Sequence, residues 1–311
     1  MAEILHKLAA AELEESPERA ELAAFLREHG SGETPQDYCQ KVRAAIDVVR
    51  RTLALYPVRG GGGSGGYDAL RAKHRPRIGL SFNGGKDCTV VLHVLLAALA
   101  GDIDNVNDTG SSARSTAVSS SSSLRQLVLP FYFSTGDVFP EETTFIESTA
   151  ANYFLEAGQA PADGSSSVQL LRLDNCSNKE GVSQLVETHG IEAILMGTRS
   201  TDPDGRWLSG VFWPSSKGWP PFMRINPCLN WSYQDVWIFL RFFGISYCAL
   251  YDYGYTSIGS RSTSRPNPHL RATPASNRGD GDCDGKADDG SPEYMPAYKL
   301  LDGSLERAGR G

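Results

Sequence analysis

The chain of 311 residues is long enough for one large domain or two, and its 40% hydrophobic and 22% charged residues are typical of a globular protein. Its formal net charge of −7 gives no support for a nucleic-acid-binding protein, so an anionic ligand has to meet a local basic pocket. The six cysteines include no C-x-x-C pair, which argues against a zinc site or a disulfide framework and favours reduced thiols.

The first 59 residues are expected to form helices that pack on the rest of the protein. Residues 1–29 are rich in Ala, Leu and Glu, which favours one or two helices, and Pro35 begins another helix that extends to Tyr56. Residues 1–15 lack the pattern of a secretory signal or a transit peptide. No apolar run reaches the ~20 residues that span a bilayer. We therefore predict a cytoplasmic protein, a monomer, with neither a membrane nor a nucleic acid as partner.

A phosphate-binding loop is predicted between a strand and a helix. Residues 77–80 are short and apolar enough for a buried strand, and residues 89–100 suit a buried helix. The residues between them are Ser81, Phe82, Asn83, Gly84, Gly85, Lys86, Asp87 and Cys88. The glycines let the backbone approach a ligand, the first helical turn has free N–H groups, and Lys86 adds a positive charge. This chemistry suits polyphosphate, although a tight turn with a solvated lysine is a simpler alternative.

This loop is neither a Walker loop nor a G-x-G-x-x-G turn, because both spacings are absent. It resembles the S-G-G-K-D-S loop of the PP-loop ATP pyrophosphatase superfamily. Enzymes of that superfamily cleave ATP between the α and β phosphates and release pyrophosphate. Asn83 stands directly before the double glycine, and Cys88 takes the place of the usual Ser or Thr.

Strand and helix patterns alternate through the next hundred residues. Strand character is found at 127–133, 168–173 and 191–196, and helix character at 141–157 and 178–189. The alternation predicts an α/β fold with a Rossmann-like, mostly parallel sheet and helices on both of its faces. Ligands of such sheets bind at the carboxyl ends of the strands, so the loops found there should converge on one crevice.

Four stretches are too rich in Gly, Ser or acidic residues for a packed core. Residues 60–66 read as a flexible connection, residues 101–123 as a disordered insert and residues 158–167 as a loose loop. Residues 273–292 are acidic and Gly-rich, which predicts a mobile loop.

A second motif follows the strand at 127–133. Residues 134–143 read Ser-Thr-Gly-Asp-Val-Phe-Pro-Glu-Glu-Thr, and Pro140 with the acidic residues after it suits a helix start. The segment resembles the D-T-G-x-x-F-P-E-T turn of the adenylylsulfate-reductase branch of the PP-loop superfamily. Ser134 replaces the leading Asp, so the role of that Asp is not carried over.

The part of the chain after Asp202 narrows the resemblance. Its motifs lie at 223–229 (Met-Arg-Ile-Asn-Pro-Cys-Leu), 230–237, 247–259, 266–270 and 306–310 (Glu-Arg-Ala-Gly-Arg). Taken in order, they closely resemble eukaryotic, fungal-type FAD synthases (FMN adenylyltransferases) of the phosphoadenylylsulfate-reductase-like branch. The resemblance covers about 77–310 outside the inserts. It implies transfer of AMP from ATP to FMN with Mg²⁺, giving FAD and pyrophosphate.

The resemblance also implies an arrangement of the chain. A helical segment at 1–59 packs on a nucleotide-binding core at 77–205, and residues 206–311 form a C-terminal segment that helps to hold the flavin. ATP and its phosphates would be bound by Ser81, Phe82, Asn83, Gly84, Gly85, Lys86, Gly197, Thr198 and Arg199. The residues expected to support catalysis are Asn83, Asp87, Asp202, Arg307 and Arg310.

Several of these residues have a structural alternative. Asp87 either orients Mg²⁺ or caps its helix, and Asp202 is either needed for activity or shapes an Asp-Pro turn. For the flavin, Asp202, Arg307, Asp235, Trp219 and Arg224 are candidates. Trp219 would stack on the ring but equally packs its own loop. Arg224 equally makes a surface ion pair, and Asp235 stands at capping-box spacing from Ser232. Trp231 and Trp237 are expected in the core.

Three other functions compete with this interpretation. A phosphoadenylylsulfate or adenylylsulfate reductase needs a nucleophilic cysteine in an E-C-G-x-H motif, which the sequence lacks. An enzyme that thiolates tRNA usually needs cysteine pairs and a basic surface. A catalytically silent nucleotide-binding protein is opposed by the joint presence of Lys86, Asp87, Asp202, Arg307 and Arg310.

Overall fold

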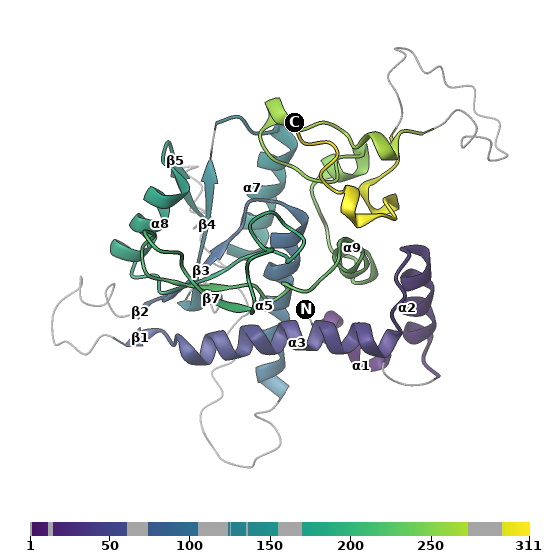
Figure 1. Ribbon diagram of the computed structural model, residues 1–311. Helices are drawn as coiled ribbons and strands as arrows, with labels where there is room; N and C mark the ends of the chain where they lie inside the picture. The colour runs from purple at the N-terminus through teal and green to yellow at the C-terminus, as the bar shows by residue number, and fades with distance from the viewer. Residues whose placement is uncertain are drawn as a thin grey trace, which may run out of the picture.

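A six-stranded sheet forms the centre of the molecule. The computed structural model describes residues 2–11, 15–60, 74–104, 124, 126–134, 136–154, 170–272 and 294–311. The strand order is β5-β4-β3-β6-β8-β7, and all neighbours are parallel except β7 and β8 (Figure 1). The strands are β3 (Ile78–Ser81), β4 (Val128–Ser134), β5 (Leu171–Asp174), β6 (Ala193–Leu195), β7 (Phe212–Pro214) and β8 (Met223–Ile225). The predicted α/β fold with a mostly parallel sheet is confirmed.

The α-helices follow the predicted order. They are α1 (Ala2–Ala11), α2 (Pro17–Glu28), α3 (Pro35–Leu55), α5 (Lys86–Asp104), α7 (Pro140–Phe154), α8 (Asn178–Glu187) and α9 (Tyr233–Phe242). A short antiparallel pair, β1 (Arg59–Gly60) and β2 (His74–Arg75), lies apart from the main sheet. After α9 the described chain forms short 3-10 helices, the first of which is η1 (Ala249–Tyr253).

Three helices begin where the sequence supplies a capping box. At α3, α8 and α9 the side chains of Thr34, Ser177 and Ser232 accept the N–H of the residue three positions on, and that residue's carboxylate accepts the cap's own N–H. The third of these carboxylates belongs to Asp235. The structure therefore confirms its capping role, and its flavin contact stays a prediction.

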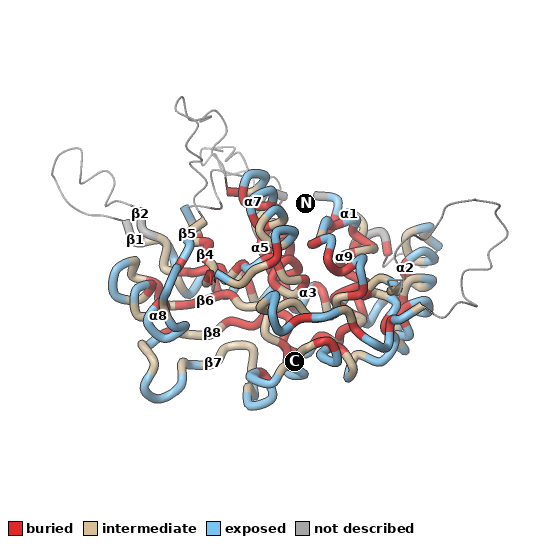
Figure 2. Tube along the Cα trace, turned by 90° about the horizontal axis from the view of Figure 1, so that it is seen from above, coloured by how far each residue is buried: buried red, intermediate tan, exposed pale blue. Residues whose placement is uncertain are grey.

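Two apolar clusters cover the two faces of the sheet. The larger one joins the sheet to α3, α5, α7 and α9 and includes Ala193 and Leu195 of β6, whereas Ile194 of the same strand belongs to the second cluster with α8. This alternation is expected because successive side chains of a strand point to opposite faces. Figure 2 shows the buried chain running through the sheet and the helices around it. Helices on both faces are therefore confirmed.

No strand is predicted in the stretch rich in Trp, Pro and Gly after Asp202, but this stretch forms β7 and β8 at one edge of the sheet. Strands of three residues are too short to show a period in sequence. Since β8 pairs with β6, this part of the proposed C-terminal segment belongs to the same sheet as the core. The division at residue 205 stays a prediction.

One helix ends later than the sequence predicts. α5 continues to Asp104, four residues into the predicted insert, because a helix with an anchored apolar face extends over weaker residues. Apart from Gly60, which belongs to β1, the remaining residues of the four Gly-, Ser- or acid-rich stretches lie outside the described residues, so their flexibility stays a prediction. Among the described helices, none is long and apolar enough to cross a membrane.

Trp237 anchors the helix α9. It is 0% exposed and makes edge contacts with the rings of Tyr233, Tyr247, Tyr251 and Tyr298. The predicted core positions of Trp231 and Trp237 are both confirmed.

We expect Trp237→Ala to lower the free energy of unfolding by about 3–5 kcal/mol, because it removes a large buried ring and leaves a cavity. Urea denaturation followed by circular dichroism measures the loss. Trp207→Ala is the matched control, since Trp207 is 76% exposed, and it should change the value by less than about 0.5 kcal/mol. Equal effects of the two substitutions would contradict this account of the core.

Candidate active site

The predicted phosphate-binding loop connects the end of β3 to the start of α5. The Phe82 N–H extends the sheet by donating to the Phe131 carbonyl at 2.8 Å. The exposed Asn83 side chain shapes the loop, because its Oδ1 accepts the Gly85 N–H at 3.1 Å and lies 3.1 Å from the Cys88 sulfur. Gly84 has φ +77°, and a Cβ there would lie 2.9 Å from Ile146 of α7. This glycine is therefore required by both conformation and space.

Lys86 is buried rather than solvated. Its side chain is 2% exposed, and its ammonium contacts the carboxylates of Asp87 at 3.0 Å and of Glu306. Its backbone N–H donates to the Tyr251 hydroxyl at 2.9 Å, and its ammonium lies 5.4 Å from the centre of the Tyr233 ring. The alternative of a tight turn with a solvated lysine is therefore wrong.

Arg199 meets the same carboxylates from the loop after β6. Its guanidinium is 1% exposed, and its Nε lies 2.9 Å from Asp87 Oδ1. It also pairs with Glu306, and it lies 3.7 Å from Asp202 Oδ1. A Cβ on Gly197 would come within 2.8 Å of the backbone of Asp87, so the glycine permits this loop to approach α5. This glycine thus lets two segments of the protein's own backbone meet, and its contact with ATP stays a prediction.

Asp202 shapes its turn and also faces the Arg199 guanidinium. Its Oδ2 accepts the Arg199 N–H at 2.7 Å, which shapes the turn, while its Oδ1 faces the Arg199 guanidinium. Burial raises the pKa of Asp202 above its ordinary value, and the Arg199 contacts offset this only in part. The turn role is confirmed, and a role in activity stays a prediction.

The charged groups of this cluster do not cancel. Lys86 and Arg199 carry +2, and Asp87, Asp202 and Glu306 carry −3, which leaves −1. Burial acts to raise the pKa of Asp87, but the two cations outweigh it and hold this pKa below its ordinary value. Asp87 therefore stays ionised, and an incoming polyphosphate needs positive charge from outside this cluster.

Glu306 belongs to the C-terminal tail, whose backbone is firmly held. The Thr256 hydroxyl donates to the Glu306 carbonyl at 2.6 Å, and the Asn267 amide donates to the Leu305 carbonyl at 2.8 Å. The Arg265 N–H donates to the Gly309 carbonyl at 2.8 Å. Sequence reasoning named the two arginines of the tail motif but missed its first residue, Glu306. The available signal was its place in the Glu-Arg-Ala-Gly-Arg motif.

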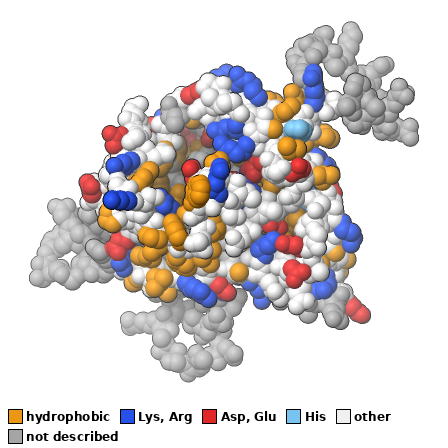
Figure 3. All heavy atoms as spheres, in the orientation of Figure 1, with side chains coloured by type: hydrophobic (Ala, Val, Ile, Leu, Met, Phe, Trp, Pro, Cys, Tyr) orange, Lys and Arg blue, Asp and Glu red, His pale blue; other side chains and the backbone are white. Residues whose placement is uncertain are grey.

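The two tail arginines lie near the loop without being part of the buried cluster. Arg307 is exposed, and the guanidinium of Arg310 packs against Gly259, where a Cβ would come within 2.0 Å of it. The pKa of Arg310 is lowered first by burial and then by the charge of Arg307, so the two guanidinium groups lie close together. Figure 3 shows Lys and Arg side chains beside a hollow near the centre of this face.

The remaining flavin candidates lie on the β7–β8 side of the sheet, outside the charged cluster. Trp219 is half-buried and packs against the second apolar cluster, next to Phe222. Arg224 of β8 reaches across the hairpin, with its Nη1 3.3 Å from the Pro214 carbonyl and its Nη2 3.3 Å from the Ser216 hydroxyl. Trp219 thus packs on an apolar cluster that reaches beyond its own loop, and stacking on a flavin stays a prediction.

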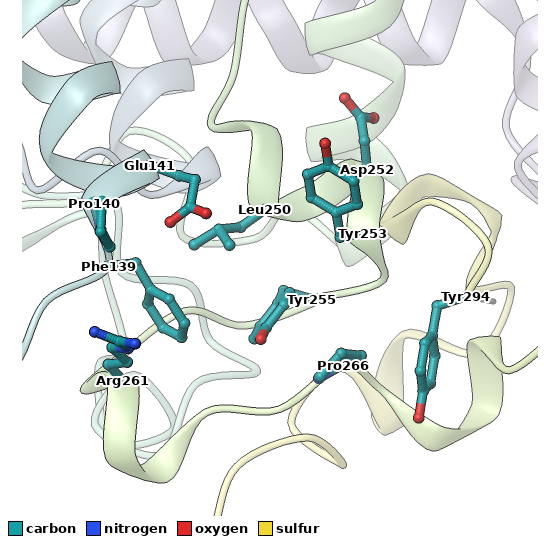
Figure 4. Close-up of a pocket in the computed structure, with 10 residues that line it drawn as sticks. All are labelled: Phe139, Pro140, Glu141, Leu250, Asp252, Tyr253, Tyr255, Arg261, Pro266 and Tyr294. Carbon is teal, nitrogen blue, oxygen red and sulfur yellow. The ribbon is translucent and has the colours of Figure 1, made fainter. Parts of the chain in front are cut away.

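A separate pocket of about 870 Å³ shares two walls with the loop (Figure 4). One wall is the start of α7, where Glu142 contacts the loop, and the other is η1, from which Tyr251 reaches Lys86. The rings of Phe139 and Tyr255 meet edge to face at 5.3 Å. The lining residues are Phe139, Pro140, Glu141, Leu250, Asp252, Tyr253, Tyr255, Arg261, Pro266 and Tyr294. None of the site residues predicted from sequence lines this pocket.

Known proteins show the same combination of motifs and fold. A family model described as the phosphoadenosine phosphosulfate reductase domain matches residues 77–266. The chain is 35% identical over 236 residues to a probable FAD synthase of Schizosaccharomyces pombe, which covers 75% of this chain and 71% of that protein. It is 32% identical over 289 residues to a probable FAD synthase of Caenorhabditis elegans, covering 92% of this chain and 43% of the nematode protein. The chain thus spans less than half of that relative's length.

A solved structure also resembles the fold. The crystal structure of Candida glabrata FMN adenylyltransferase in complex with FMN and the ATP analog AMPCPP matches with a TM-score of 0.62 and 25% identity. The match covers 94% of this chain and 96% of the solved chain. The match therefore extends beyond the sheet to most of the chain.

We expect Glu306→Gln to lower the free energy of unfolding by about 3–5 kcal/mol, because it removes one partner from a buried charge cluster and leaves Lys86 and Arg199 short of negative charge. Guanidinium denaturation measures the change. The control is Asp174→Asn, which breaks an exposed pair with Arg172 and should cost less than about 1 kcal/mol. A near-neutral Glu306→Gln would show that the carboxylate is not needed to hold the cluster.

Proposed function

The chain belongs to the FAD synthases that carry a phosphoadenosine phosphosulfate reductase domain, and we propose that it transfers AMP from ATP to the phosphate of FMN, yielding FAD and pyrophosphate. The observation that carries the proposal is the contact of the phosphate-binding loop, the loop after β6 and the C-terminal tail through Lys86, Arg199 and Glu306. This contact brings a loop suited to polyphosphate next to two arginines of the tail.

The reaction asks the protein mainly for positioning. An oxygen of the FMN phosphate attacks the α-phosphorus of ATP in line while pyrophosphate departs, so orientation and charge stabilisation dominate. The FMN phosphate is already largely ionised at neutral pH, and no general base is needed. A chemical step that titrates with a single side chain would count against this.

The loop offers its own contacts to the departing pyrophosphate. The Gly85 N–H is bound only by the exposed Asn83 side chain, which a phosphate oxygen can replace. Phosphate binding by Lys86, as the sequence predicts, requires its ammonium to exchange the Glu306 carboxylate for phosphate oxygens. Arg307 and Arg310 are the cations outside the buried cluster, and a guanidinium fork suits phosphate. We assign them to the phosphates of the two substrates.

Mg²⁺ fits this site together with the phosphates of ATP. Both oxygens of Asp87 already face cations, Oδ2 toward Lys86 and Oδ1 toward Arg199. Among the described residues no group of three or more His, Cys, Asp or Glu side chains could hold a metal ion. Mg²⁺ accepts one or two carboxylates plus substrate phosphates and water. When bound, it would neutralise phosphate charge, with Asp87 as the candidate protein ligand.

Three lesser assignments remain predictions from composition and motif. They are a monomeric state, a cytoplasmic location and the absence of a nucleic-acid partner. The rival functions, a reductase-like enzyme or a silent nucleotide-binding protein, are separated from the proposed one by the product that forms.

Purified protein mixed with ATP, Mg²⁺ and FMN is expected to form FAD and pyrophosphate in equal amounts. Chromatography measures the FAD, and an assay of released pyrophosphate measures the second product. Asp202→Ala and Arg307→Ala should each lose at least about 100-fold in rate while remaining folded, because the first removes the carboxylate that holds the Arg199 loop and the second removes positive charge from the site. Lys179→Ala, a change at an exposed residue of α8, is the control for a surface charge. Nucleotide binding without FAD formation would reject the proposed reaction.

The flavin ring is assigned to the β7–β8 hairpin through Trp219. We expect Trp219→Ala to raise the KM for FMN at least about tenfold, as loss of an aromatic contact would, with the KM for ATP little changed. Steady-state kinetics with each substrate varied in turn measures the split. Tyr255→Ala, in the aromatic pocket of Figure 4, should leave the KM for FMN unchanged. The reverse pattern would place the ring in that pocket.

A further inference from the structure

Glu142 is a half-buried titratable residue that the proposed reaction does not use, and one of its carboxyl oxygens, Oε2, is buried. Glu142 lies in the first turn of α7, directly beneath the phosphate-binding loop. A Cβ built on Gly84 would lie 3.6 Å from Glu142 Cγ and 2.9 Å from Ile146, one turn further along the helix. The two side chains thus support the loop from the same face of α7.

One oxygen of this carboxyl group lacks a partner. Oε2 is buried and has no hydrogen-bond partner among the described residues. An ionised carboxylate with an unpaired buried oxygen is costly, and the cost falls when the group takes up a proton.

The charged and titratable groups that face Glu142 come from three elements. Arg310 of the tail is the cation whose charge it feels, although the two make no ion pair. The thiol of Cys248, just before η1, also feels its charge, and Glu141 precedes it on the same helix. Burial is the largest effect and raises the pKa of Glu142 to about 7, with Phe139 and Arg310 opposing it.

We propose that Glu142 takes up one proton from solvent when a polyphosphate anion binds at the Asn83–Lys86 loop, so that the affinity for the anion falls as the pH rises above neutral. An anion above the loop repels the ionised carboxylate and favours its protonated form. The protonated form also presents an O–H from the oxygen that otherwise has no partner. The inference rests on the proposed function only in that the loop binds polyphosphate, and not on FAD formation.

The affinity for the anion depends on pH because anion binding is linked to protonation of Glu142. Below about pH 7 Glu142 is protonated before the anion arrives, so binding does not depend on its titration. Above that pH the proton has to be taken up on binding, which weakens the affinity by up to about tenfold per pH unit until the pKa of the complex is reached. Glu142→Gln keeps the shape of the protonated side chain and cannot ionise.

The test is calorimetric titration of inorganic pyrophosphate into the full chain, without Mg²⁺ or FMN, between pH 6 and 9. The ratio of the wild-type Kd to the Glu142→Gln Kd should be near one at pH 6 and should rise at least about tenfold by pH 8.5. Taking the ratio cancels the ionisation of pyrophosphate itself. Titrations in buffers of different ionisation enthalpy should show that wild type takes up about one more proton than the variant near pH 8.

Glu141→Gln is the matched control, because it removes the exposed neighbouring carboxylate on the same helix and should keep the wild-type pH dependence. If Glu142→Gln does not fold, judged by circular dichroism, Glu142→Leu replaces it and should give the same flat profile. Parallel pH profiles of wild type and variant overturn the inference, and so does absence of pyrophosphate binding at every pH. Proton-linked binding without FAD formation would support the inference and reject the proposed reaction.

Discussion

The buried ion pairs among Lys86, Arg199, Asp87 and Glu306 are the interaction on which the site depends. Charges removed from water are tolerated only when each has partners of opposite sign. Because the four residues come from α5, from the loop after β6 and from the tail, pairing them fixes three distant parts of the chain in one place. The position of the tail arginines follows from this constraint.

The sheet order explains why these segments meet. β3 and β6 are parallel neighbours, so the loops that follow them leave the same edge side by side. The tail reaches that edge from outside the sheet and is held by Thr256 and Asn267, both buried. In a site built in this way, ion pairs and hydrogen bonds hold distant segments together, which suits a reaction in which orientation matters more than covalent chemistry.

The groups around the predicted phosphate-binding loop carry more negative than positive formal charge. With Asp202 included, the buried cluster has a formal charge of −1, and Glu142 adds a further carboxyl group beneath the loop. In the proposed function, positive charge comes from Arg307 and Arg310 and from Mg²⁺ bound with the nucleotide. Under that proposal, anion binding depends on how each carboxyl group is neutralised, by an ion pair in the cluster and, as we infer, by a proton at Glu142.

The sequence by itself determined the elements and the loop. Apolar periods, Pro35 and the double glycine located α3, α5, α8, β3 and β4 within a few residues, because these signals are local. Ordered motifs identified the family. The tertiary structure alone decided that Lys86 is buried, that Glu306 pairs with it 220 positions away and that Glu142 lies under Gly84. It also decided that β7 and β8 join the sheet. Burial and pairing between distant residues leave no period or spacing in the sequence, so only the folded chain reveals them.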